Sequence, residues 1–509
     1  MTAAAHRPAL ARAEGEAGPR RALILAGGGM RVAYQAGVIR ALQERGLRFA
    51  HADGTSGGTI NLAMLLSGVP IPEMWERWRT LDVKDFVSLL PLREYLNPFK
   101  LQAMGDADGI IGKVFPHLGI DVARINAATG LDGTFNVCNF TKKTNEAIPH
   151  QQVDLDLLVA GISLPLFMPP VRKGDSLYLD SVWIKDANLT EAVRRGAEEI
   201  WVVWCIGNTG QYLDGAFHQY VHMIELSANG ALFEELGRIG ESNQRRAKPI
   251  VVHLIKPEYP LPLDPDFYLG RIDAATLLDM GYQDAHRYLA GAAAAGLPLE
   301  PEITAMKPAA LGITFRETME GGFALSETDP AAGEAKGKAA GTILMMHATI
   351  LIEELRAFVE DPAHAGRITG TVSFAPLGER LPAREGVFRL FSPAEDPRMR
   401  YMVYEMGFVS GDKEYYLAGK KQVRDDPGPD MWKDTTTLFT RLHLGPDASG
   451  PVVGAGILHL GVKELGKLAS TMHATGATSV GEEISAVAQF GKFFLGQLWE
   501  RYAGSAAQQ

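Results

Sequence analysis

The stretch Ala50-His-Ala-Asp-Gly-Thr-Ser-Gly-Gly-Thr-Ile60 places one serine, Ser56, between Gly54 and Gly58. The residues before Gly54 can end a short strand, and those after Ser56 have the apolar spacing of a buried helix. Small neighbours allow a sharp turn, and the serine hydroxyl then projects at the N-terminus of the helix, where the helix dipole favours negative charge. The pattern predicts a nucleophile elbow. The alternative is a glycine-rich loop with an N-capping serine.

The residues on either side of this stretch alternate between strand and helix. Residues 22–26 are a continuous apolar run, which is typical of a parallel strand with both faces covered. Three glycines follow, and residues 30–45 repeat apolar residues at helical spacing until Gly46. We therefore predict an α/β layer fold with right-handed crossovers. Later strands are expected at 134–140, 177–180, 199–206 and 249–255, before a closing helix near 274–295.

The composition is that of an ordinary globular protein, and 509 residues are enough for two or three domains. A net charge of −10 argues against a nucleic-acid partner, which would require a basic surface. The two cysteines, Cys138 and Cys205, give no disulfide framework, so we expect a reducing, cytoplasmic compartment.

Any membrane contact is expected to be peripheral. Residues 1–20 are rich in Ala and Arg and lack the apolar core of a signal peptide, so they are predicted to form a disordered tail. The longest uncharged apolar runs, 157–171 and 342–352, are shorter than the roughly 18 residues that a membrane-spanning helix needs.

The segment Gly27-Gly28-Gly29-Met30-Arg31 would place free backbone N–H groups at the start of a helix, where they can bind an anion. If the segment lies beside Ser56, these donors can stabilise the oxyanion of an acyl-transfer intermediate. Arg31 could support the loop or meet a phosphate.

A dinucleotide-binding loop is the alternative for these glycines. Gly27 and Gly29 would be the first two glycines of that motif, and Asp53 would be the acidic residue after the second strand. Val32 stands where the third small residue should be, which argues against this interpretation.

Asp180 ends a predicted strand, 177–180, that follows a hairpin turn at residues 173–175. An aspartate at a strand end can face a cleft, although such a residue more often serves a turn or a cap. Upstream of this hairpin, residues 161–171 would end a helix at Pro165 and present an apolar loop beside Asp180.

Four motifs in this order resemble those of patatin-like phospholipases, over about residues 21–290. They are Gly27-Gly28-Gly29-Met30-Arg31, Gly54-Thr55-Ser56-Gly57-Gly58, the 163–171 loop and Asp180. The resemblance implies a three-layer α/β/α fold. It implies an enzyme that hydrolyses acyl esters of lipids without a cofactor or a metal. It also implies a serine–aspartate dyad that needs no histidine. By this resemblance Ser56 is the nucleophile, Asp180 is the base, and the three glycines form the oxyanion loop.

The proposed base needs a special environment, because an unperturbed aspartate with a pKa of about 3.9 is a weak base for a serine hydroxyl. A pocket lined by Leu164, Leu166, Phe167 and Met168 would raise the pKa of Asp180 and exclude water.

The chain departs from the family pattern at two places. Asp180 is followed by Ser181-Val182, where the family usually has Gly-Gly or Gly-Ala, and Val32 replaces the usual glycine after Arg31. A β-branched residue resists positive φ, so the turn after Asp180 is expected to differ. These departures also suit a catalytically silent lipid-binding or scaffold protein, which is the alternative function.

A Ser-Asp-His triad is the alternative among hydrolases. The chain has 13 histidines, and His253 near the end of a predicted strand is the candidate by position. An isolated histidine near a strand is more often a hydrogen-bonded structural residue, so the dyad is preferred.

The C-terminal part of the sequence predicts a separate β-rich domain. Residues 291–340 are rich in Ala, Gly, Pro and Glu, which favours a linker or crossover. Residues 341–460 contain closely spaced strand signals that indicate a sandwich or barrel, and helices at 463–472 and 482–502 close the domain, which is expected to span 341–505.

Residues 315–321 and 415–420 loosely resemble an accessory domain of bacterial cholesterol-oxidase-like flavoproteins. That resemblance implies binding of a lipid or sterol-like ligand or docking to a membrane. The alternative is a structural domain that only packs on the hydrolase. Asp425, Asp426 and Asp430 could hold calcium, but the prolines and glycine between them favour a solvated turn.

Overall fold

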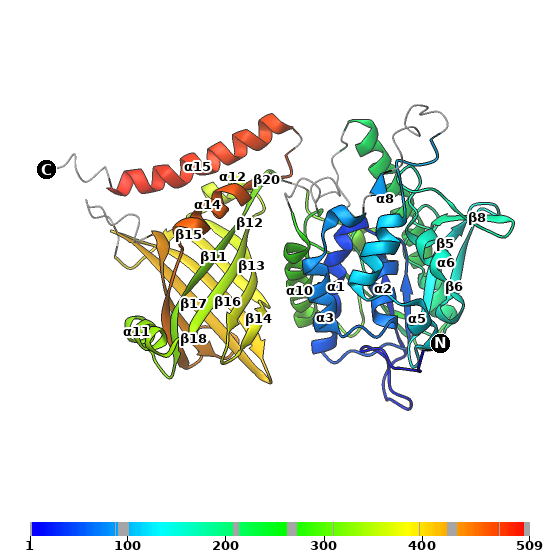
Figure 1. Ribbon diagram of the computed structural model, residues 1–509, viewed down its shortest axis with the longest axis horizontal. Coiled ribbons are helices and arrows are strands. Elements are labelled where there is room, and N and C mark those ends of the chain that lie inside the picture. The colour runs from blue at the N-terminus through cyan, green and yellow to red at the C-terminus, as the bar shows by residue number, and fades with distance from the viewer. Residues whose placement is uncertain are drawn as a thin grey trace. The chain divides into compact units, whose positions relative to one another are not determined.

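The computed structural model describes residues 3–502 except 87, 90–100, 207–211, 213, 262–271, 309, 397, 425–434 and 478. The chain divides into two compact units, Met1–Pro308 and Ala309–Gln509. Figure 1 shows the first unit in blue to green and the second in green to red. Each unit has its own apolar core, so each is described by itself.

This boundary differs from the linker expected at 291–340. The second unit already contains a strand, β11 (Gly312–Leu325), and a helix, α11 (Pro330–Ala340), within that range. Buried residues alternate along β11 at Ile313, Phe315 and Met319. The surrounding Gly, Ala and Glu residues mask that alternation in the sequence.

The N-terminal segment also differs from the expected disordered tail. Residue Leu10 is fully buried in the core of the first unit. The backbone N–H of Phe49 donates to the carbonyl of Leu10, and the N–H of Arg12 donates to the carbonyl of Phe49. Burial of Leu10 and these two hydrogen bonds hold the segment against the sheet.

The first unit is built on an eight-stranded mixed sheet in the order β10-β9-β1-β2-β5-β8-β7, with β6 paired to β5. The first five strands in this order run parallel, and β6, β7 and β8 are antiparallel to their neighbours. Parallel strands end at the same edge of a sheet, so the loops after β1 and β2 meet there. The bounds are β1 Arg21–Leu25, β2 His51–Gly54, β5 Asp132–Asn139, β6 Thr144–Pro149, β7 Val171–Lys173, β8 Ser176–Asp180, β9 Glu199–Val203 and β10 Val251–Ile255.

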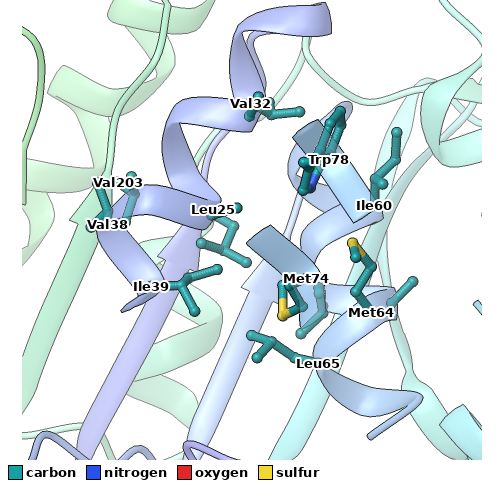
Figure 2. Close-up of a cluster of buried hydrophobic side chains, with 14 of the residues drawn as sticks. Leu25, Val32, Val38, Ile39, Ile60, Met64, Leu65, Met74, Trp78 and Val203 are labelled. Atoms are coloured by element: carbon teal, nitrogen blue, oxygen red, sulfur yellow. The ribbon is translucent and has the colours of Figure 1, made fainter. Parts of the chain in front are cut away.

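Helices cover both faces of this sheet, which confirms the predicted three-layer α/β/α fold. Alternate residues of β1 face opposite sides, because Leu23 and Leu25 belong to one apolar cluster and Ala22 and Ile24 to another. The first cluster includes helices α1, α2, α3, α6 and α10, and Figure 2 shows part of it around Leu25. The second includes α7 and α8. The bounds are α1 Ala33–Glu44, α2 Gly58–Leu66, α3 Ile71–Thr80, α6 Leu155–Ile162, α7 Leu189–Arg194, α8 Ala216–Asn243 and α10 Ala274–Gly291.

Helices α1 and α10 cross at two glycines. A Cβ on Gly37 would lie 2.1 Å from the carbonyl oxygen of Leu278, and a Cβ on Gly281 would lie 2.0 Å from the carbonyl oxygen of Tyr34. Only glycine at both positions allows the two backbones to approach so closely.

The second unit is a closed antiparallel barrel, which confirms the β-rich domain with closing helices. The ring runs β12-β11-β19-β18-β17-β16-β15-β13, and pairing of β12 with β13 closes it. Strands β14 and β20 extend it at β13 and β11. The remaining bounds are β12 Ile343–Ile352, β13 Ala365–Phe374, β14 Gly378–Pro382, β15 Glu385–Pro393, β16 Met399–Ser410, β17 Lys413–Arg424, β18 Thr437–Leu444, β19 Val452–His459 and β20 His473–Thr475.

Helices α12 (Leu355–Glu360), α14 (Val462–Thr471) and α15 (Val480–Tyr502) accompany the barrel (Figure 1). Phe490 of α15 is buried in the barrel core, and its ring centroid lies 5.8 Å from that of Phe315 on β11. The last helix is therefore attached through aromatic packing.

Candidate functional site

Ser56 lies at a tight turn between strand β2 and helix α2. Its φ is 52°, in the left-handed region that residues other than glycine rarely adopt, and its residue surface is only 8% exposed. A Cβ on Gly58 would lie 2.1 Å from the carbonyl oxygen of Leu25, and one on Gly54 would lie 3.0 Å from the carbonyl oxygen of Gly58. Glycine at these positions therefore allows the chain to bend back against β1.

The glycine loop that follows β1 contacts this turn directly. A Cβ on Gly57 would lie 2.7 Å from the carbonyl oxygen of Gly29, and one on Gly27 would lie 2.9 Å from the Cβ of Ser56. In the described part of the chain, the backbone N–H groups of Gly28 and Gly29 donate no hydrogen bond to a protein acceptor. The N–H of Gly27, by contrast, donates to Oδ1 of Asp186 at 2.9 Å.

Asp180 lies at the end of β8, is 1% exposed, and is placed by main-chain contacts. Its N–H donates to the carbonyl of Ser163 at 3.0 Å, and its Oδ1 accepts from the N–H of Val182 at 2.9 Å. Burial raises the pKa of Asp180 to about 7, although the Ser56 hydroxyl and the Val182 N–H partly oppose that rise. The structure thus brings Asp180 beside Ser56.

The alignment of the Ser56 hydroxyl with Asp180 is loose. Oδ2 of Asp180 has no partner with good hydrogen-bond geometry among the described residues.

Val182, in the turn after Asp180, does not have a positive φ, so the turn accommodates this β-branched residue without that strain. Its side chain is buried in the cluster that covers one face of the sheet. The Ser181 hydroxyl donates to Oδ1 of Asn145 on β6. Side-chain burial and this hydrogen bond therefore hold a turn for which the family pattern has glycine.

A second buried carboxylate, Asp186, lies in the same site and was not expected from the sequence. It has no exposed surface, and its Oδ2 has no hydrogen-bond partner among the described residues. Burial and the charge of Asp180 raise the pKa of Asp186 well above its usual value, and the charge of Arg31 opposes that rise. The segment 185–188 looks like an ordinary polar turn in the sequence, so only the contact with Gly27 reveals Asp186.

Arg31 lies under the glycine loop and is 8% exposed. Its Nε donates to the carbonyl of Gly28 at 3.0 Å, while its Nη1 is buried without a partner among the described residues. This hydrogen bond joins Arg31 to the glycine loop, while its role in the site stays a prediction.

Asp53 occupies a different position from the one that a dinucleotide site requires. It is fully buried and accepts hydrogen bonds from the side chains of Thr134 and Asn136 on β5. Asn136 also donates to Oγ1 of Thr55, and its Oδ1 accepts from Asn188. Asp53 therefore belongs to a network under the Ser56 turn and has no exposed surface for a ribose.

An aromatic wall borders the acidic site. Tyr220 on α8 packs against Phe167 and Trp183, with ring-centroid distances of 5.7 and 5.5 Å. Burial and the nearby charge of Asp180 raise the pKa of Tyr220. Of the loop expected to line the pocket, Phe167 joins this wall, whereas Leu166 is 52% exposed.

His253 is separated from Ser56 by the strand order. It lies on β10, with β9 and β1 between it and β2. Its ring stacks on Trp201 with centroids 4.0 Å apart, and its Nδ1 is hydrogen-bonded to the hydroxyl of Tyr288 at 3.0 Å. The structure gives His253 packing and hydrogen-bond partners away from the serine.

Within the described residues, no group of three or more His, Cys, Asp and Glu side chains is arranged to hold a metal ion. Asp425, Asp426 and Asp430 lie outside the described residues. No helix in the part of the chain that the structure describes is long and apolar enough to cross a bilayer.

A serine at a strained turn above a mostly parallel sheet, with helices on both faces, is an arrangement of α/β/α hydrolases. Within that class, residues 23–193 form a patatin-like phospholipase domain, since they match the model of the patatin-like phospholipase family. The family supports lipid hydrolase activity in general, and hence a lipid substrate.

Among solved structures, the chain is similar to VipD from Legionella pneumophila, with 14% sequence identity and a TM-score of 0.30. The match covers 54% of this chain and 67% of that one. No curated protein matches the chain significantly.

Proposed function

We propose that the first unit is a lipid acyl hydrolase in which Ser56 is the nucleophile and Asp180 is its base. The observation that carries the proposal is the fully buried carboxyl of Asp180 beside the Ser56 hydroxyl, with a pKa raised to about 7. A carboxylate with this pKa is a better proton acceptor at neutral pH than an exposed one. It can serve without a histidine.

The reaction begins when Asp180 takes the hydroxyl proton as Ser56 Oγ attacks the ester carbonyl. The resulting oxyanion requires hydrogen-bond donors. The N–H groups of Gly28 and Gly29 suit this role, because no protein acceptor receives them among the described residues. The N–H of Gly27 is already donated to Asp186, so Gly27 contributes by positioning the loop.

The intermediate collapses when the C–O bond to the leaving alcohol breaks and protonated Asp180 returns the proton to that oxygen. Water then attacks the acyl-serine, again losing its proton to Asp180, and the carboxylic acid leaves as Ser56 recovers its proton. Phe167 and Tyr220 give the site an apolar wall against which an acyl chain can pack.

Two variants and a serine probe test this proposal. Ser56→Ala should abolish fluorophosphonate labelling and lower hydrolysis of a short-chain ester by about 10⁴-fold or more, and Asp180→Asn should lower hydrolysis similarly. Ser242→Ala, on the end of α8, is the matched control and should keep both activities. Folding of each variant is checked by its melting temperature.

A catalytically silent lipid-binding protein is the alternative function. It predicts that folded wild-type protein binds lipid vesicles but neither hydrolyses esters nor reacts with the fluorophosphonate. The second unit as a lipid-binding or membrane-docking module stays a prediction, and so does peripheral contact of the whole chain with a membrane.

A further inference from the structure

Asp186 is a fully buried acid at the centre of the site that the proposed mechanism leaves unused. It belongs to the segment between β8 and α7 and lies against the glycine loop. Its Oδ1 accepts the N–H of Gly27 at 2.9 Å, while its Oδ2 is buried without a partner among the described residues. A buried carboxylate without a compensating partner is costly, which favours the protonated acid.

Asp186 lies close to the nucleophile as well as to the loop. The position that a Cβ of Gly27 would occupy is 2.3 Å from Oδ1 of Asp186 and 2.9 Å from the Cβ of Ser56. Gly27 is therefore confined between the two side chains. A displacement of Asp186 would shift the start of the loop that carries Gly28 and Gly29.

Among the described residues, the charged and titratable groups that interact with Asp186 come from three segments. Asp180, at the end of β8, opposes its ionisation, and Arg31, in the first turn after the glycine loop, favours it. The thiol of Cys205, just after β9, is fully buried, and burial raises its pKa. No ion pair joins Arg31 to Asp186 among the described residues. Two carboxylates in one buried site do not both ionise readily.

We propose that Asp186 is a positioning residue that acts in its neutral form: it fixes Gly27 and leaves Asp180 as the ionised carboxylate beside Ser56. A negative Asp186 would oppose the negative charge that develops on the oxyanion, whereas the neutral acid keeps the hydrogen bond to the loop. The inference rests on the hydrolase mechanism proposed above.

Two substitutions separate the hydrogen bond from the charge. Asp186→Ala removes the acceptor for Gly27, so kcat for a soluble ester should fall about 10²-fold, as on loss of one oxyanion donor, with little change in KM. Asp186→Asn keeps a neutral acceptor and should restore kcat to within about threefold of wild type. Equal losses in the Ala and Asn variants, with melting temperatures like wild type, would overturn the positioning role.

The pH profile reports the charge of Asp186. Activity should rise with pH as Asp180 ionises near pH 7. If Asp186 is neutral in this range, Asp186→Asn leaves the midpoint of that rise unchanged. If Asp186 is ionised, its removal lowers the pKa of Asp180 and moves the midpoint down by about one pH unit or more, which would contradict the proposal.

A measurement that needs no activity keeps this inference distinct from the proposed function. In full-length protein labelled with ¹³C at the aspartate carboxyl groups, the Asp186 signal is the one lost in Asp186→Asn. We expect it at the protonated position at pH 7, even in Ser56→Ala. An ionised Asp186 at pH 7 would overturn the inference, while absent hydrolysis in wild type would overturn only the proposed mechanism.

Discussion

Ser56 has the strained backbone that a nucleophile elbow requires. Its φ of 52° persists because β2, α2 and the close contacts of Gly57 and Gly58 hold both sides of the turn. The strain is local, so its effect on stability can be measured by changing this residue alone.

Ser56→Gly should therefore be more stable than Ser56→Ala by about 1 kcal/mol, because glycine adopts positive φ without strain. Both variants lack the hydroxyl, so the comparison isolates the backbone. Chemical denaturation of the full-length chain measures the difference in free energy of unfolding. Equal stability of the two variants would show that the turn is not strained.

Under the proposed mechanism Asp180 links activity to pH, and its buried carboxyl is expected to lower stability above neutral pH. Its folded pKa, about 7, lies above the usual aspartate value, so the folded protein binds this proton more tightly than the unfolded chain does. Stability is therefore retained near pH 4 and is lost as the pH rises toward 7 and beyond.

Asp180→Asn should be inactive yet more stable than wild type at pH 8, by about 1 to 4 kcal/mol, with the difference shrinking toward pH 4. Asp175→Asn, in the exposed turn between β7 and β8, is the control and should match wild type at both values. Thermal unfolding at the two pH values tests this. A lower melting temperature for Asp180→Asn than for wild type at pH 8 would contradict the predicted direction of the stability change.

The positions of Ser56 at a glycine-flanked turn and of Asp180 at a strand end could be predicted from the sequence, because each depends on a local pattern. Asp186 could not. Its partner, Gly27, lies 159 residues earlier, and the contact exists only after β1 and the segment after β8 meet at one edge of the sheet. Interactions of this kind leave no local signal in a single sequence.

Strand β11 is an element that could not be predicted from a local sequence pattern either. Its inward-facing residues include Glu317, which interrupts the apolar alternation, so that the segment resembles part of a linker in the sequence. Glu317 is accommodated because Tyr404 on β16 donates to its Oε1 at 3.1 Å and Lys421 on β17 lies 3.5 Å from its Oε2. The sequence cannot reveal an ion pair between strands that are about one hundred residues apart.

Lys421→Met should destabilise the barrel by about 3 to 5 kcal/mol, because it leaves Glu317 buried without its cation. The double variant Lys421→Met/Glu317→Gln should recover most of this loss, since no uncompensated charge remains. Hydrogen exchange of the barrel strands, followed by mass spectrometry, measures the effect. Similar exchange in wild type and the single variant would contradict it.

Contact between α1 and α10 gives a second prediction for whole elements. Gly281→Ala would drive a Cβ into the carbonyl of Tyr34 and should cost about 1 to 3 kcal/mol through forced separation of the helices. Gly291→Ala, at the end of the same helix with open space around it, is the control and should be neutral. The melting temperatures of the two variants, compared with that of wild type, test this prediction.

For the whole molecule, the alternation of strands and helices that begins the first unit and the β-rich character of the second could be predicted from periodicity and turn residues, whereas strand β6 and helix α8 were not predicted. The boundary between the two units could not be predicted, because the composition of residues 309–340 resembles a linker while their partners lie later in the chain. Closure of the barrel also depends on one long-range pairing, between β12 and β13.

That pairing has a consequence for how the chain behaves in crowded conditions. In the part of the chain that the structure describes, each of the eight strands in the ring has a hydrogen-bonded neighbour on both sides, whereas β14 and β20 each pair with one strand only. We therefore expect ring closure to limit edge-to-edge pairing of the second unit with other molecules. A substitution that broke the pairing of β12 with β13 would leave an unpaired edge on each of these two strands.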